Sequence, residues 1–281
     1  MLRARWAQGK FICVGLDSDS DKIPASLRRH DVGSTLIDFS RAIAEATADL
    51  VCAFKPNSAF YERHGFTGIS ALKVIIDDLH AIAPEVPVIL DAKRADIGNT
   101  NIGYVKMVFD YLQADAVTVH PYLGAEALEP FLDRADKGVF VLCRTSNPGA
   151  GEFQDLEIEF RAGTSGSEFK RLYQVVAHSV ASNWNKNGNC GLVVGATYPD
   201  ELRKVRELVG DIPILIPGIG AQGGDLEATV AAGKNSSSQG MIINSSRGII
   251  FASSGPDFAE AARRETERLH NLVNRCLAVP G

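Results

Sequence analysis

The sequence lacks the features that mark several large classes of protein. It has no run of about 18 or more apolar residues, so we expect no membrane span. It has no long basic run, and its formal net charge is −5, which argues against a nucleic-acid partner. The amino-terminal segment has no apolar signal-peptide core, so we expect a cytoplasmic location.

The cysteines indicate neither a disulfide framework nor a metal site. Their number is five, and no C-x-x-C spacing occurs. Several lie in apolar runs, where cysteine behaves as a small hydrophobe, so we expect reduced and mostly buried thiols. No set of histidine, cysteine and carboxylate residues has a convincing metal-ligand spacing, and neither a metal nor a cofactor is predicted. The cysteines are Cys13, Cys52, Cys143, Cys190 and Cys276.

Apolar runs alternate with segments of helical periodicity along the whole chain. Runs that predict strands lie at Phe11–Asp17, Val51–Asn57, Val86–Lys93, Ala114–Pro121, Gly138–Ser146, Cys190–Thr197, Ile212–Gly220 and Gln239–Arg247. Helical periodicity occurs at about 33–48, 66–82, 98–112, 123–134, 165–185, 199–209, 224–232 and 256–277. Strands that are apolar almost throughout are typical of a parallel sheet covered on both faces.

Eight β/α units in a chain of this length predict a single (β/α)8 barrel domain over residues 1–281. The alternative is an open doubly wound sheet, which usually carries a G-x-G-x-x-G fingerprint after its first strand. The first predicted strand ends in Gly15-Leu16-Asp17 without that fingerprint, which favours the barrel. In a barrel, functional residues lie where the strands end at their carboxyl side.

The third predicted strand ends in a dense cluster of charge. Asp91 and Lys93 are two residues apart, so on a strand they point to the same face, whereas the direction of Asp96 does not follow from this period. Lys55 and Asp17 end neighbouring strands and extend the alternation of charge. A lysine between carboxylates is expected to stay protonated and to act as a proton donor. The alternatives are a salt bridge that merely closes the strand, or Mg²⁺ bound by Asp91 and Asp96.

The loops after the seventh and eighth predicted strands predict a phosphate site. Small residues in Pro217–Gly224, Gly220 among them, allow backbone N–H groups to approach an anion, and Gln222 can donate from its amide. Ser246 and Arg247 come from the last loop, and a guanidinium can bind phosphate oxygens in pairs. A phosphorylated small molecule is therefore the expected substrate class. The long connection at about 147–164 is predicted to be a lid, although a plain surface insertion is the alternative.

These segments resemble the orotidine 5′-monophosphate decarboxylase family, in its longer bacterial subclass. The D-x-K-x-x-D signature is shared with related barrels that act on sugar phosphates, but its combination with the other segments is far more specific. The matching segments are Val14–Asp17, Phe54–Asn57, Asp91–Thr100, Thr145–Gly149, Pro217–Gly224 and Ser245–Gly248.

The resemblance implies decarboxylation of orotidine 5′-monophosphate to UMP and CO2, the final step of de novo pyrimidine synthesis, without a metal. Lys93 would protonate C6 of the pyrimidine, and Asp91 would face the substrate carboxylate. Asp96 and Thr100 would reach the ribose bound by the neighbouring subunit, so a homodimer is implied. The remaining implied contacts are Asp17 and Lys55 to ribose, Ser146 and Pro217 to the base, Gln222 and Arg247 to phosphate, with Asn57, Gly220 and Ser246 as further substrate-binding residues.

Two other functions fit parts of this pattern. A magnesium-dependent sugar-phosphate decarboxylase or aldolase on the same barrel would lose its activity in EDTA. A non-catalytic sensor of nucleotide phosphates would not depend on Lys93 for its role. A binding protein has no need of alternating lysine and aspartate at a strand end, which disfavours the sensor.

Overall fold

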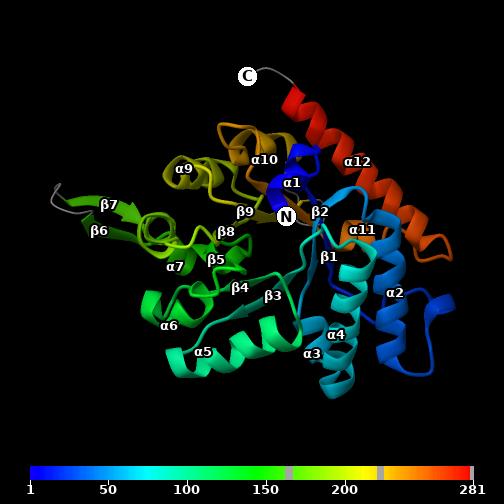
Figure 1. Ribbon diagram of the computed structural model, residues 1–281. Coiled ribbons are helices and arrows are strands. Elements are labelled where there is room, and N and C mark those ends of the chain that lie inside the picture. The colour runs from blue at the N-terminus through cyan, green and yellow to red at the C-terminus, as the bar shows by residue number, and fades with distance from the viewer. Residues whose placement is uncertain (162–166, 220–224, 279–281) are drawn as a thin grey trace.

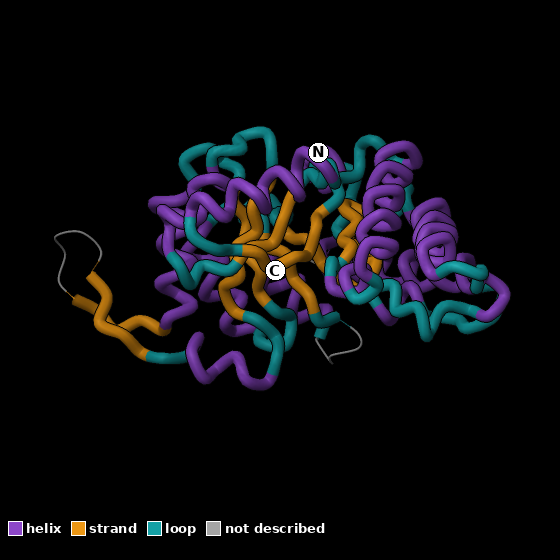
Figure 2. Tube along the Cα trace, turned by 90° about the horizontal axis from the view of Figure 1, so that it is seen from below, coloured by secondary structure: helices purple, strands orange, loops and turns teal. Residues whose placement is uncertain are grey.

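The chain forms a barrel of parallel strands surrounded by helices (Figures 1 and 2). The computed structural model describes residues 1–161, 167–219 and 225–278, and within them the main sheet has eight strands in the order β2-β1-β10-β9-β8-β5-β4-β3. The strands are β1 (Ile12–Leu16), β2 (Val51–Pro56), β3 (Ile89–Arg94), β4 (Ala116–Val119), β5 (Gly138–Arg144), β8 (Cys190–Val194), β9 (Ile214–Pro217) and β10 (Met241–Ser245).

The barrel is closed between its first and last members in that order, β2 and β3. Parallel bridges join Phe54 to Val88 and Asn57 to Asp91, and the Phe54 N–H donates to the Pro87 carbonyl at 3.1 Å. The predicted (β/α)8 fold is therefore confirmed. Each predicted strand overlaps an observed one, and the observed strands are shorter.

Helices cover the outside of the barrel. Eight of them follow the strands of the barrel in turn: α2 (Val32–Thr47), α4 (Gly65–Ile82), α5 (Gly98–Val105), α6 (Gly124–Leu132), α8 (Leu172–Ser179), α9 (Pro199–Val209), α10 (Leu226–Gly233) and α12 (Phe258–Ala278). Shorter helices are α1 (Leu2–Ala7), α3 (Ala59–Glu62), α7 (Gly151–Gln154) and α11 (Arg247–Ile250). Among the described residues, no helix is long and apolar enough to cross a membrane.

One predicted helix is wrong at its start. Helical periodicity was expected over 165–185, but Ser167–Arg171 forms strand β7, which pairs antiparallel with β6 (Glu157–Arg161). The hairpin extends away from the barrel (Figure 1), and α8 begins only at Leu172. The Phe160 ring of β6 packs edge-on against His178, so the hairpin contacts α8. The Lys170 ammonium of β7 lies over the same ring.

The core is built from the apolar strand residues and the inner faces of the helices. Fully buried side chains include Val14 and Leu16 on β1, Phe54 on β2 and Phe131 on α6. Four of the cysteines are free and buried, and Cys276 is partly exposed. Burial raises the pKa of the Cys13 thiol to about 12, which makes it unreactive at neutral pH.

A buried arginine holds the amino-terminal side of the barrel together. Arg206 on α9 donates from Nε to the Gly233 carbonyl at 2.8 Å and from Nη2 to the Gly240 carbonyl at 2.9 Å. Its Nη1 donates to the carbonyls of Gly210 and Ile212 at 2.5 and 2.7 Å. These carbonyls lie just after α9, at the end of α10 and just before strands β9 and β10, so one side chain connects four chain segments.

We expect Arg206→Met to lower the free energy of unfolding by about 3 kcal/mol, because buried carbonyls would lose their donor. The functional residues predicted from the sequence lie at the carboxyl ends of the strands, so any activity that depends on them should be unchanged in the folded variant. Urea unfolding measures the change. Arg203→Met is the matched control, since Arg203 lies exposed on the same helix. The expectation would be contradicted if the free energy of unfolding fell no further in Arg206→Met than in this control.

Candidate active site

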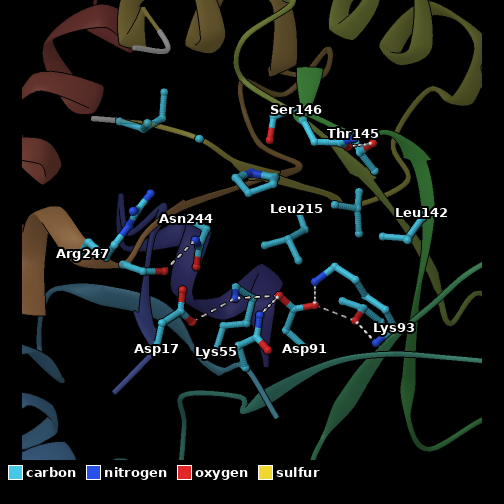
Figure 3. Close-up of a pocket in the computed structure, with 18 of the residues that line it drawn as sticks. Asp17, Lys55, Asp91, Lys93, Leu142, Thr145, Ser146, Leu215, Asn244 and Arg247 are labelled. Atoms are coloured by element: carbon cyan, nitrogen blue, oxygen red, sulfur yellow. Dashed lines mark hydrogen bonds and ion pairs between the residues drawn. The ribbon is translucent and has the colours of Figure 1, made fainter. Parts of the chain in front are cut away.

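A cavity of about 470 Å³ opens at the carboxyl ends of the strands. It brings together side chains from strands that are far apart in the sequence (Figure 3). Of the residues predicted to form the site, the cavity is lined by Asp17, Lys55, Asn57, Asp91, Lys93, Ser146, Pro217, Ser246 and Arg247.

Asp91 is the centre of the charged cluster. Its Oδ2 accepts from Lys55 Nζ at 3.1 Å and from Asn57 Nδ2 at 3.3 Å. Its Oδ1 accepts from Lys93 Nζ at 2.6 Å and from Thr118 Oγ1 at 2.8 Å. Both carboxylate oxygens are therefore occupied by donors, two of them cations, which disfavours Asp91 as a ligand of Mg²⁺.

The two buried members of the cluster, Asp91 and Lys55, are ionised at neutral pH. Burial would raise the pKa of Asp91, but the charges of Lys55 and Lys93, with the hydrogen bonds, outweigh it and hold the pKa well below its usual range. Burial would lower the pKa of Lys55, yet the negative charges of Asp91 and Asp17 raise it above its ordinary value. Asp17 Oδ1 lies 3.8 Å from Lys55 Nζ, so the charges alternate in space as they do in the sequence.

The backbone of β3 bends where the chemistry is concentrated. The pairing of β3 with β4 shifts register between Leu90 and Arg94, and Lys93 has a φ of 46°, in the left-handed region. The Lys93 N–H is held by Thr118 Oγ1 at 3.0 Å. Lys93 and Asp91 thus face the same cavity, as predicted, although the strand is not regular. The Lys93 side chain is 48% exposed, whereas that of Lys55 is only 4% exposed.

The depressed pKa of Asp91 predicts how stability depends on pH. The contribution of Asp91 is complete above its unfolded pKa of about 4 and is lost as the pH falls through the lower folded pKa. At pH 7 we expect Asp91→Asn to unfold with about 3 kcal/mol less free energy than the wild type, because two lysines lose their partner. Urea unfolding at pH 7 and pH 3 should show that the difference in unfolding free energy between the two proteins is smaller at pH 3. A difference that widens in acid would contradict the expectation.

Arg247 lies at the other end of the site from Lys93. In Figure 3, Asp91, Lys55 and Asp17 occupy the space between these two cations. Arg247 is the first residue of α11, is exposed, and forms no ion pair with any carboxylate in the described part of the chain. Pro217 and Gly218 bring the end of β9 to the same cavity. The predicted contacts at Gly220 and Gln222 lie outside the described residues.

Two predicted site residues do not line this cavity. Asp96 and Thr100 lie where β3 leads into α5, and Thr100 is exposed. The conformation there is fixed by Asn101, which is fully buried: its Oδ1 accepts from the Asp96 N–H at 2.9 Å and its Nδ2 donates to the Asp96 carbonyl at 2.7 Å. Asp96 is therefore held outside the cavity that Asp91 and Lys93 line.

Several residues that line the cavity were not predicted as site residues, and three of the polar ones make informative contacts. Thr118 on β4 contacts Asp91, Asn244 on β10 donates to Ser246 Oγ at 3.3 Å, and Gln154 reaches the cavity from α7. Thr118 is the single polar residue of β4, and Asn244 is one of two polar residues that end β10, and this was the signal that could have identified them. No pattern in the sequence marked Gln154.

Comparisons with known proteins identify the family of this chain. Residues 10–264 match the family described as "Orotidine 5'-phosphate decarboxylase / HUMPS family". The chain belongs to this family. It is 50% identical over 275 residues to an orotidine 5′-phosphate decarboxylase from Ralstonia pickettii, covering 98% of this chain and 97% of the relative. The family predicted from the sequence is thus confirmed, and with it the class of the protein, a decarboxylase enzyme.

Solved structures of the family share the fold. An OMP decarboxylase from Leishmania donovani superposes with a TM-score of 0.82 at 35% identity, covering 99% of this chain and 98% of that one. A UMP synthase from the same organism gives a TM-score of 0.84 at 37% identity. This chain spans 56% of the length of that longer protein.

Proposed function

We propose that this enzyme decarboxylates orotidine 5′-monophosphate to UMP and CO2. The observation that carries the proposal is the layout of the cavity. An ammonium that contacts a buried carboxylate lies at one end, and a guanidinium with no carboxylate partner in the described residues lies at the other (Figure 3). A nucleotide with a carboxylate on its base and a phosphate on its ribose carries groups that match both ends.

The reaction needs only a proton donor at the right carbon. When the bond between C6 and the carboxylate breaks, CO2 leaves and the electron pair stays on C6. The Lys93 ammonium beside that carbon stabilises the developing charge and then transfers a proton to C6. In this proposal neither a metal nor a cofactor takes part.

Asp91 has two roles in the proposed mechanism. It holds the Lys55 and Lys93 ammonium groups in place, at 3.1 and 2.6 Å. It would also face the substrate carboxylate, and the repulsion between the two would end when CO2 departs. Asn57 supports the same carboxylate through its side-chain amide, so we assign Asn57 to positioning Asp91 as well as to substrate binding.

The other predicted contacts complete the binding of the nucleotide. Asp17 and Lys55 would bind the ribose hydroxyls, Ser146 and Pro217 the base, and Gln222 and Arg247 the phosphate, with Gly220 and Ser246 in the phosphate loops. The proposal includes the lid at about 147–164. Asn147 and Gln154 of this connection line the cavity, which supports the proposed lid.

We further propose that the enzyme works as a homodimer in which Asp96 and Thr100 complete the neighbouring site. Large apolar side chains are exposed close to these residues: Ile97 (57%) and Ile102 (50%) at α5, and Tyr122 (84%) just before α6, which packs against α5. Exposed apolar residues grouped in this way are typical of a protein interface. A second copy would cover them and bring its own Asp96 to the site.

Mixed dimers test the shared site. Lys93→Ala and Asp96→Ala subunits should each be inactive alone. Co-expressed, they should regain about one quarter of wild-type activity, because half the dimers are mixed and one of their two sites is intact. The control pairs Lys93→Ala with Asp91→Asn. Each of these substitutions inactivates the site of its own subunit, so the mixed dimers should regain no activity. Mixed dimers of the first pair without activity would contradict the shared site.

The function itself is tested by following the absorbance of orotidine 5′-monophosphate in the presence of EDTA. Loss of the orotidylate absorbance with the wild type, and none with Lys93→Ala, is the expected result. Turnover that stops in EDTA would instead favour a magnesium-dependent decarboxylase or aldolase. A folded, dimeric wild type without turnover would overturn the proposal.

A further inference from the structure

Gln154, the last residue of α7, is bound to the end of β5 by two hydrogen bonds. Its Oε1 accepts from the backbone N–H of Thr145 at 2.8 Å, and its Nε2 donates to Thr145 Oγ1 at 2.8 Å. The Thr145 hydroxyl in turn donates to Asn147 Oδ1 at 2.7 Å. The Gln154 amide therefore holds Thr145, which precedes Ser146, and through Thr145 it holds Asn147, which follows Ser146.

The position of α7 is itself fixed by a buried cation. Arg144, the last residue of β5, is 3% exposed and donates from Nη2 to Asp155 Oδ2 at 3.1 Å. Its Nη1 lies 3.4 Å from Gln154 Oε1, and its guanidinium stacks over the Tyr198 ring at 4.3 Å. A buried charge tolerates little displacement from its partners, so the contacts of Arg144 hold Gln154 in a fixed position.

Ser146 is closely packed from the other side. An added Cβ at Gly195, which follows β8, would lie 2.7 Å from Ser146 Cβ, so this wall of the cavity has no room for displacement of Ser146. Both the hydrogen bonds of Gln154 and the packing of Gly195 act on the short segment that carries Ser146 into the cavity.

We propose that Gln154 is a positioning residue that sets Ser146 against the pyrimidine and so contributes to recognition of the base. The inference rests on the proposed function, because it assigns the base to the Ser146 side of the cavity. Gln154 acts through Thr145 and Ser146 rather than on the reacting atoms. Its loss therefore weakens binding of ligands that carry the base and leaves ligands without it unaffected.

The test compares two ligands by calorimetry: UMP, and ribose 5-phosphate, which lacks the base. In Gln154→Leu the Kd of UMP should rise about tenfold, the effect of one lost hydrogen bond, while the Kd of ribose 5-phosphate stays within twofold of the wild type. Gln154→Glu keeps the acceptor for the Thr145 N–H and should give a smaller rise. Glu152→Gln, at an exposed position on the same helix, is the matched control and should change neither value.

If the Kd of UMP and the Kd of ribose 5-phosphate rose by the same factor in Gln154→Leu, the proposal would be overturned, because the substitution would then affect the cavity in general. Unchanged UMP binding would also overturn it. If the leucine variant does not fold, Gln154→Glu decides in the same way. A wild type that binds UMP no more tightly than ribose 5-phosphate would overturn the proposed function, since the base would then not be recognised.

Discussion

Replacement of Lys93 by alanine is expected to lower kcat by about 10⁴-fold or more, because in the proposed mechanism one ammonium both stabilises the charge that develops at C6 and supplies the proton. No neighbouring group can replace it: Lys55 is buried between Asp91 and Asp17, with Nζ 3.1 Å from Asp91 Oδ2 and 3.8 Å from Asp17 Oδ1. The decrease in absorbance of orotidine 5′-monophosphate under saturating substrate measures the effect.

The control for Lys93→Ala is Lys73→Ala, which removes a lysine paired with Asp77 on the outer surface of α4. It should leave kcat unchanged. Lys93→Ala should still bind UMP, because the groups assigned to phosphate and ribose remain. A variant that keeps more than about a tenth of wild-type kcat would exclude Lys93 as the proton donor.

Replacement of Arg247 by alanine is expected to act mainly on substrate capture. We expect KM for orotidine 5′-monophosphate to rise about 100-fold, since a charge-assisted contact with phosphate contributes about 3 kcal/mol. The decline in kcat should be much smaller, because Arg247 lies across the cavity from Lys93 (Figure 3). Initial rates over a wide range of substrate concentration separate the two constants.

Arg203→Ala is the control for Arg247→Ala, because Arg203 is half-exposed on α9 and pairs only with Asp200 among the described residues. If Arg247→Ala and Lys93→Ala lost kcat to a similar extent with KM unchanged, the division of the site into a phosphate end and a chemical end would be wrong.

The sequence predicted the barrel because its strands are apolar almost throughout, as a sheet buried on both faces requires. It predicted strand ends less well. The strands predicted to reach Ser146 and Thr197 end earlier, at Arg144 and Val194. The β6–β7 hairpin was missed although Glu157-Ile158-Glu159-Phe160 alternates with a period of two, because the hairpin has one partly exposed apolar face and no core to identify it.

Within the site, side-chain alternation was enough to pair Asp91 with Lys93, and the barrel rule was enough to bring Arg247 to the same rim. The partners of Asp91 were harder to predict. Thr118 is separated from it by 27 residues and meets it only because β3 and β4 are neighbours. Gln154 needed the position of α7, which depends on the buried Arg144 and on no local pattern in the sequence.

The left-handed backbone at Lys93 has a consequence for how this enzyme can evolve. A residue with a side chain costs about 1 kcal/mol or more in that conformation, whereas glycine adopts it freely. Glycine at this position would relieve the backbone but would remove the ammonium that lies 2.6 Å from Asp91 Oδ1. The ion pair and the backbone strain therefore oppose each other at the residue that we propose as the proton donor, and a substitution there would have to satisfy Asp91 as well as the backbone.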